Sequence, residues 1–129
     1  MLNTYNSDGS YNKNSYLVTN TYKGEWIIIK LPVSFILKKI TIGALTNYKN
    51  QAPKNFIIYT AIDVNTWRQI DSNNIIVQYE SFTKELNNNE ISSDTYCITV
   101  NQIFENGITL KFDEIVLYDK VNTPNIILP

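Results

Sequence analysis

The sequence contains no histidine, and this absence restricts the chemistry that the chain can perform. Histidine is the commonest general base near neutral pH and the commonest ligand of transition metals. Without it, Ser-His-Asp triads, Cys-His pairs and zinc hydroxide sites are unavailable in their usual form. Asp113 and Glu114 are adjacent in a strand pattern, so they point to opposite faces and cannot act as a glycosidase pair. We therefore predict that the protein is not an enzyme.

Cysteine is nearly absent as well. The single residue of this type, Cys97, excludes an intramolecular disulfide, so the fold must be stabilised by packing. Such a chain is compatible with a reducing compartment, and its localisation stays open. Cys97 lies among threonine and isoleucine in an alternating pattern. We expect a small buried hydrophobic residue there, because a reactive thiolate needs a nearby cation or helix amino terminus.

Clustered charge and long apolar runs are also missing. The 11 basic and 12 acidic residues give a formal net charge of -1, and the lysines are scattered, whereas binding to phosphate backbones requires clustered cations. No apolar run approaches the ~20 residues that span a bilayer, and the amino terminus MLNTYNSDGSYNKN is polar where a signal peptide needs a hydrophobic stretch. We expect no nucleic acid partner and no membrane insertion.

Asparagine, isoleucine and tyrosine are prominent, and they separate along the chain. Isoleucine and tyrosine favour strands, whereas asparagine favours turns. Ile36 to Ala44 and Tyr96 to Asn101 alternate with a period of two, which is typical of strands. One stretch, Ser81 to Asn87, could form a turn or two of helix. The apolar runs are Trp26 to Leu31, Ile36 to Leu45, Phe56 to Ile62, Ile75 to Tyr79, Tyr96 to Phe104 and Ile108 to Tyr118.

This pattern predicts an all-β fold, an antiparallel β-sandwich, in one domain of 129 residues. Within it, the segment GEWIIIKLP (24–32) is apolar on both faces. A strand of this kind is expected to be covered on both sides, with Tyr5 to Lys23 as the outer cover. We expect Trp26 and Trp67 to lie in the core, and Pro32 to end the ladder pairing of its strand.

Four segments follow in order the pattern of a known family: GEWIIIKLP, KKITI, APKNFIIYTAIDVNTWRQID and DTYCITVNQIFENGITLKFDEIVLYD. Over about residues 5 to 119 the chain resembles discoidin-like (coagulation-factor C-type) domains, which are galactose-binding-like jelly rolls. The GEW…LP variant is most similar to copies in capsid-associated or surface proteins of large DNA viruses. The chain departs from the family where sugar-binding relatives commonly have arginine or histidine, because the loop Thr46 to Gln51 has only a lysine.

The resemblance implies a structural calcium site at Asp8 and Glu114, since many such domains hold the ion between an amino-terminal Asp-Gly turn and the last strand. Calcium needs six to eight oxygen ligands, which two carboxylates and loop carbonyls could provide. A solvated Asp8 in an Asp-Gly turn is the simpler alternative. No other cofactor is expected.

Aromatic side chains in polar loops indicate a ligand-binding end. Tyr5, Tyr11, Tyr16, Tyr22 and Tyr48 lie in asparagine-rich segments, where a tyrosine ring could stack on a sugar, contact a protein or cover the sandwich. The resemblance implies glycan binding at one end of the sandwich. The residues predicted to bind ligand are Tyr16, Asn47, Tyr48, Lys49, Asn50, Gln51, Phe104 and Asn106.

The carboxyl terminus is predicted to be a tail. Residues 1–120 form the single discoidin-like domain, and residues 121–129 follow it. Ile126, Ile127 and Leu128 form a short apolar patch that either covers an edge of its own sandwich or docks into a neighbouring chain. Because such domains are usually modules of larger assemblies, we slightly favour the intermolecular role.

We thus predict a non-catalytic recognition or adhesion module that works in a larger assembly such as a virion or in a homo-oligomer, with glycan binding through its end loops. The alternative is a stand-alone, lectin-like carbohydrate-binding module.

Overall fold

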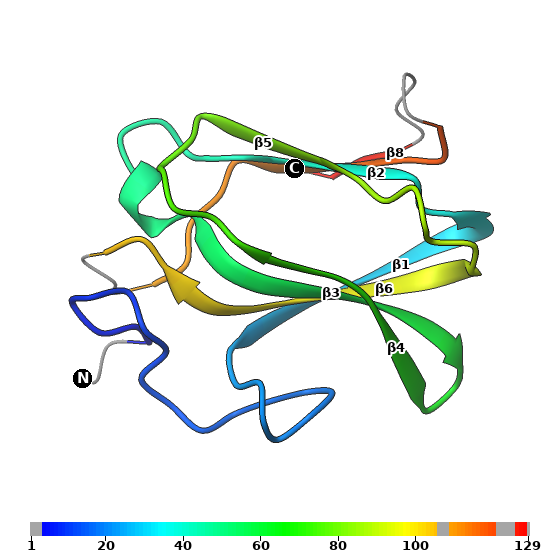
Figure 1. Cartoon of the computed structure of the whole chain (residues 1–129), viewed down its shortest axis with the longest axis horizontal. Coiled ribbons are helices and arrows are strands. Elements are labelled where there is room, and N and C mark those ends of the chain that lie inside the picture. Colours follow the sequence, from blue (N-terminus) through cyan, green and yellow to red (C-terminus); the bar gives the residue numbers. More distant parts are fainter. Residues whose placement is uncertain (1–3, 106–108, 121–125, 129) are drawn as a thin grey trace.

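A computed structural model describes residues 4–105, 109–120 and the backbone of 126–128. These residues form two four-stranded sheets that pack face to face, and every strand pair is antiparallel (Figure 1). The predicted all-β antiparallel sandwich is confirmed. The first sheet has the order β1 (Glu25–Ile36), β6 (Ser92–Ile103), β3 (Pro53–Asp63), β4 (Thr66–Asn74), and the second β5 (Ser81–Glu85), β2 (Lys39–Gly43), β7 (Glu114–Tyr118), β8 (Ile126–Leu128).

The core lies between the sheets and is filled by alternate residues of the central strands. Ile40 and Ile42 of β2 are 0% and 1% exposed, whereas Thr41 between them is partly exposed. Tyr96 and Ile98 of β6 face them from the first sheet and are equally buried. Alternating burial is what a pleated strand with one face on a core requires. In the described part of the chain, no helix has the length and apolarity needed to cross a membrane.

The helical turn considered for Ser81 to Asn87 is wrong. Residues 81–85 form strand β5, which pairs with β2 through Thr41 and Thr83. Phe82 points toward the core, where its ring meets that of Phe56 edge to face at 5.9 Å. The segment alternates exposed and half-buried residues, so pairing and packing of a period-two face outweigh the weak helical propensity of a five-residue stretch.

The prediction that β1 is covered on both faces, with Trp26 in the core, is also wrong. Trp26 and Ile28 are 38% and 50% exposed, while Ile29 and Leu31 are buried. Figure 1 shows residues 13–23 outside the first sheet, on the side away from the second sheet. This segment is attached over β3 and β6, through hydrogen bonds from Tyr22 to Asn55 and from Asn101 to Lys23. The outer face of β1, with Trp26 and Ile28, is therefore only partly covered.

Pro32 interrupts its ladder but does not end its strand. Pairing of β1 with β6 stops at Lys30 and resumes at Phe35, and the strand continues to Ile36. Proline lacks the amide hydrogen that a ladder needs, and β1 is an edge strand, where this loss is tolerated.

The last described segment adds an edge strand to the second sheet. Ile126–Leu128 forms β8 and pairs with Ile115 to Leu117 of β7. Of the two alternatives predicted for the tail, the structure shows this segment covering an edge of its own sandwich. Residues 121–125 and 129 lie outside the described residues, and the domain boundary at residue 120 stays a prediction.

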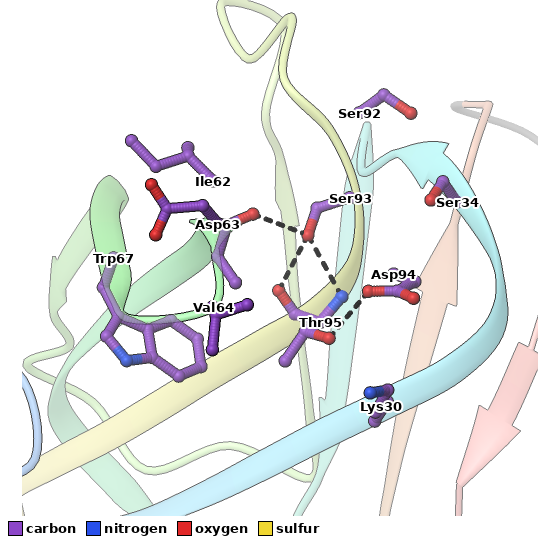
Figure 2. A pocket seen from close by; sticks show the side chains of 11 residues that line it. Lys30, Ser34, Ile62, Asp63, Val64, Trp67, Ser92, Ser93, Asp94 and Thr95 are labelled. Atoms are coloured by element: carbon purple, nitrogen blue, oxygen red, sulfur yellow. Dashed lines mark hydrogen bonds between the residues drawn. The ribbon is translucent and has the colours of Figure 1, made fainter.

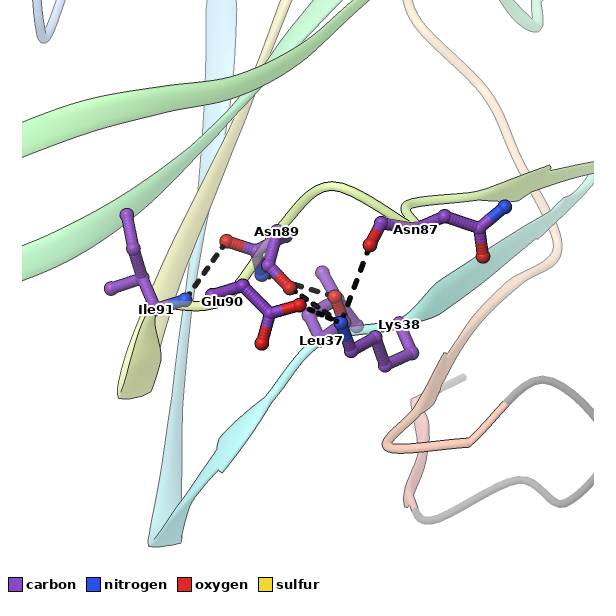
Figure 3. Close-up of polar contacts among 6 residues, drawn as sticks. All are labelled: Leu37, Lys38, Asn87, Asn89, Glu90 and Ile91. Atoms are coloured by element: carbon purple, nitrogen blue, oxygen red, sulfur yellow. Dashed lines mark hydrogen bonds and ion pairs between the residues drawn. The ribbon is translucent and has the colours of Figure 1, made fainter.

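A buried asparagine organises the connection between β5 and β6 (Figure 3). The Asn89 amide donates to the carbonyl of Leu37 at 3.0 Å and accepts from the amide of Ile91 at 3.2 Å. The ammonium of Lys38 donates to the backbone oxygen of Asn89 at 2.7 Å and pairs with Glu90 at 2.9 Å. These bonds join the loop to the chain between β1 and β2.

Replacing Asn89 by alanine should destabilise the domain by about 1 to 3 kcal/mol, because the buried carbonyl of Leu37 loses its donor. The measurement is chemical denaturation followed by circular dichroism. Asn88→Ala is the matched control, since Asn88 is exposed and its loss should change stability by less than about 0.5 kcal/mol. Equal stability of the two variants would contradict the role of the amide.

Candidate functional site

An open pocket of about 450 Å³ lies at one end of the sandwich. It is formed by the β2–β3 loop, which contains the 3-10 helix η1 (Lys49–Gln51), by the β4–β5 loop and by the segment after β6. Figure 1 places η1 beside this last segment, at the same end of the two sheets. We call this pocket the loop pocket. Its lining residues are Thr46, Asn47, Lys49, Asn50, Gln78 and Glu105.

The backbone of the β2–β3 loop is held by local hydrogen bonds. Asn47 has a positive φ of 72°, a conformation that asparagine tolerates better than most residues. The amide of Gln51 donates to the carbonyl of Tyr48 at 3.0 Å. The amide of Glu105 donates to the carbonyl of Asn50 at 2.9 Å, which joins this loop to the segment after β6. The walls of the pocket are thus set by main-chain bonds without a ligand.

The pocket is polar and nearly balanced in charge. The ammonium of Lys49 lies 3.0 Å from a carboxylate oxygen of Glu80, in an ion pair whose glutamate is 84% exposed. Such a pair contributes little to stability, so Lys49 can exchange this partner for a ligand. Glu105 supplies a second acceptor group on the opposite segment. A surface that offers amide, ammonium and carboxylate groups suits a ligand rich in hydroxyls.

Three of the predicted ligand-binding residues, Asn47, Lys49 and Asn50, line the loop pocket. Gln51 is buried, and its amide donates to the carbonyl of Thr109 at 2.9 Å, so its side chain holds the loop in place. Tyr48 is 42% exposed beside the pocket. The ammonium of Lys111 lies 3.9 Å from the centroid of the Tyr48 ring, which makes a cation–π contact.

Two other predicted residues, Phe104 and Tyr16, do not line this pocket. The Phe104 ring packs edge-on against Tyr79, with centroids 5.8 Å apart. Tyr16 lies in the segment before β1 and is 46% exposed. Asn106 lies outside the described residues. Ligand binding by any of the predicted residues stays a prediction.

Sequence reasoning missed three lining residues, Thr46, Gln78 and Glu105. Thr46 and Glu105 are each next to a predicted residue in the sequence, and this proximity could have identified them. No sequence feature indicates Gln78, because the β4–β5 loop is brought to the pocket by the pairing of β5 with β2.

Two of the loop tyrosines have structural roles. Tyr5 is 0% exposed, and its hydroxyl donates to the carbonyl of Val100 at 2.9 Å. Tyr22 donates to Asn55 at 2.8 Å. Burial raises the pKa of both hydroxyls well above the ordinary value. The Tyr5 ring is therefore not available to stack on a ligand, and both hydroxyls attach the amino-terminal segment to the first sheet.

The two residues implied as calcium ligands lie in different parts of the fold, Asp8 in an amino-terminal turn and Glu114 in strand β7. The carboxylate of Asp8 accepts from the amide of Ser10 at 2.9 Å and from its hydroxyl at 2.6 Å, and these bonds lower its pKa. Its turn pairs with the end of β6 through Ser10 and Gln102, whereas Glu114 begins β7 opposite Gly43. The described residues contain no group of three or more acidic, histidine or cysteine side chains suited to a metal. Calcium stays a prediction.

Cys97 has the predicted environment. Its side chain is 0% exposed, and burial raises the pKa of the thiol to about 11. A thiol of this kind is protonated at neutral pH and inert as a nucleophile.

No protein-family model and no curated protein matches the sequence. Several solved structures share the fold. The family 32 carbohydrate-binding module from Streptococcus pneumoniae EndoD has 13% identity and a TM-score of 0.60, covering 74% of this chain and 69% of the module. CpGH89CBM32-5 from Clostridium perfringens, solved in complex with GalNAc-β-1,3-galactose, has 17% identity and a TM-score of 0.61, covering 77% and 70%. CBM32-1 from a family 31 glycoside hydrolase of the same organism has 19% identity and a TM-score of 0.59, covering 86% and 89%.

These similarities establish the fold, a jelly-roll β-sandwich of the galactose-binding-domain-like type, and at such identities they establish no more than the fold. The three similar structures named above come from two bacteria, and they do not support the viral resemblance or a place in a virion. Assembly partners and a homo-oligomer find no support in them either.

Proposed function

We propose that the protein is a non-catalytic carbohydrate-binding module, and that the loop pocket holds its glycan ligand. The observation that carries the proposal is an open, polar pocket with a fixed backbone at the end of a sandwich whose fold carbohydrate-binding modules share. One of those modules was solved with a disaccharide of N-acetylgalactosamine and galactose. A neutral ligand of this class is compatible with the balanced charges of the pocket.

The lining side chains have complementary roles in this proposal. The amides of Asn47 and Asn50 can each donate to and accept from sugar hydroxyls, and Lys49 donates. Tyr48 stands at the rim with part of its ring exposed, and its cation–π contact with Lys111 restrains it. A restrained ring loses little conformational entropy on binding, which favours its use as an apolar contact for the sugar.

The test is a glycan array followed by calorimetric titration of the ligands that it selects, beginning with GalNAc-β-1,3-galactose. Asn50→Ala and Lys49→Ala should each weaken binding by about fivefold or more, since each removes hydrogen bonds to the ligand worth about 1 kcal/mol. The melting temperature should change little, because both side chains are partly exposed and Lys49 forms a weak surface ion pair.

Lys23→Ala is the charge-matched control. Lys23 lies before β1, outside the lining of the loop pocket, and its ammonium lies 3.5 Å from the side-chain oxygen of Asn14. This variant should bind as the wild type does. An array with no bound glycan, or affinities that both pocket variants leave unchanged, would contradict the proposal.

A further inference from the structure

A second pocket, of about 430 Å³, lies where the β3–β4 hairpin meets the start of β6 and the second half of β1. Figure 1 shows this hairpin at the end of the sandwich opposite η1. The two pockets adjoin the two ends of β3, which has 11 residues, and at about 3.3 Å per residue those ends are roughly 30 Å apart. We call this second site the hairpin pocket, and its chemistry rests on Lys30, Asp63, Trp67, Asp94 and Thr95.

One hydrogen bond between strands and two local ones hold the walls of the hairpin pocket. The hydroxyl of Ser93 donates to the carbonyl of Ala61 at 2.8 Å, which joins the start of β6 to the end of β3. The hydroxyl of Thr95 donates to a carboxylate oxygen of Asp94 at 2.7 Å. In the hairpin turn, the amide of Asn65 donates to the carboxylate of Asp63 at 3.0 Å. The pocket is therefore formed before any ligand enters.

The hairpin pocket is lined by one flat aromatic ring and by several polar side chains. Figure 2 shows the indole of Trp67 on one side, Lys30 and Asp94 on the other, and Val64 and Thr95 between them. Trp67 is only half-buried and does not belong to the core cluster, so the prediction that it lies in the core is wrong. An aromatic face opposite hydrogen-bonding groups is the usual composition of a site that orients a small polar ring.

The charges of the hairpin pocket favour a neutral ligand over an anionic one. Its charged lining residues are one lysine and two aspartates, which sum to a charge of −1. Hydrogen bonds from Asn65 and Thr66 lower the pKa of Asp63, so its carboxylate is ionised at neutral pH. Two carboxylates accept hydroxyl hydrogens well, and they repel a uronate or a sulfate.

We propose that the hairpin pocket is a second carbohydrate site, which takes one neutral sugar ring. Trp67 contacts the C–H face of the ring, Asp63 and Asp94 accept from its hydroxyls, and Lys30 donates to a ring or hydroxyl oxygen. The class of ligand rests on the proposed function, whereas the location of the site does not. With sites at both ends, one chain can join two glycan chains and gain avidity on a dense glycan surface.

The chain contains two tryptophans, and this makes the test direct. Their indole N–H signals are followed by NMR in the full chain during titration with galactose, N-acetylgalactosamine, glucose and N-acetylglucosamine. Trp26 serves as the internal control, because it lies outside the hairpin pocket. At least one sugar should move the signal of Trp67 and leave that of Trp26 in place.

Asp63→Asn should weaken the binding reported by Trp67 about tenfold, a factor equal to 1.4 kcal/mol. The variant should fold normally, since asparagine retains an oxygen that can accept from the amide of Asn65. Trp67→Ala should abolish binding at this site, and a calorimetric titration should then show one fewer site per chain.

Lys49→Ala separates the two proposals, because it changes the loop pocket alone and should leave the response of Trp67 intact. The second site is overturned if none of the four sugars moves the Trp67 signal, or if Asp63→Asn leaves its affinity unchanged. Either result would leave the loop pocket standing. A Trp67 response that persists when the loop pocket binds nothing would support the hairpin pocket by itself.

Discussion

Replacing Phe56 by alanine should destabilise the domain by about 3 to 5 kcal/mol, the usual range for deleting a buried aromatic ring. Phe56 is 0% exposed in the first half of β3, and its ring meets that of Phe82 edge to face at 5.9 Å. The cavity left by alanine cannot close, because residues of both sheets surround it. Thermal unfolding should show a fall in melting temperature of roughly 10 to 20 °C.

Trp26→Ala is the matched aromatic deletion. The sequence alone predicts a buried Trp26 and an equally large loss, but this side chain is 38% exposed on the outer face of β1. Its removal should therefore cost no more than about 2 kcal/mol, since much of the ring is in water in the folded state. A Trp26 variant as unstable as the Phe56 variant would show that the outer face of β1 is covered.

Replacing Gly9 by alanine should be the second large perturbation, at about 2 kcal/mol or more. Gly9 has a φ of +91°, and a Cβ atom there would lie 1.9 Å from the carbonyl oxygen of Ile103. The backbone must move away, which breaks the bond from the amide of Ile103 to the carbonyl of Gly9 at 2.9 Å. It also loosens the segment that places Tyr5 in the core.

Two measurements test this effect. Denaturation gives the loss of stability, and hydrogen exchange should be faster at the amide of Ile103 in the variant. Gly43→Ala is the control, because its added Cβ would meet the Glu114 side chain at 3.4 Å and Asp113 at 3.7 Å, and no positive φ is required. Its stability should remain within about 1 kcal/mol of the wild type. A stable Gly9 variant with slow exchange at Ile103 would contradict the close approach.

Much of the fold could be predicted from the sequence. The period of two around Ile40 and Ile98 identifies strands with one buried face, and asparagine clusters mark the turns between them. Residues 81–85 were assigned incorrectly because so short a segment acquires its conformation from the strand beside it, and β2 lies far away in the sequence.

The candidate site was less accessible to sequence reasoning. Asn47, Lys49 and Asn50 could be proposed because they share one loop, whereas Gln78 joins them from a different loop. The hairpin pocket was missed altogether. Its residues come from β1, the β3–β4 hairpin and β6, and no short spacing in the sequence connects Lys30, Trp67 and Asp94.

Composition and periodicity are local properties of the chain, so they are sufficient to predict an all-β fold and to exclude histidine chemistry. Which hydrophobic residues are covered depends instead on contacts between segments that are distant in the sequence. Tyr5, in a polar segment, is in the core, and Ile28, within a run of three isoleucines, is 50% exposed. Burial depends on which distant segment lies over a face, and the chain from 13 to 23 is attached to β3 and β6 in a way that leaves Ile28 exposed.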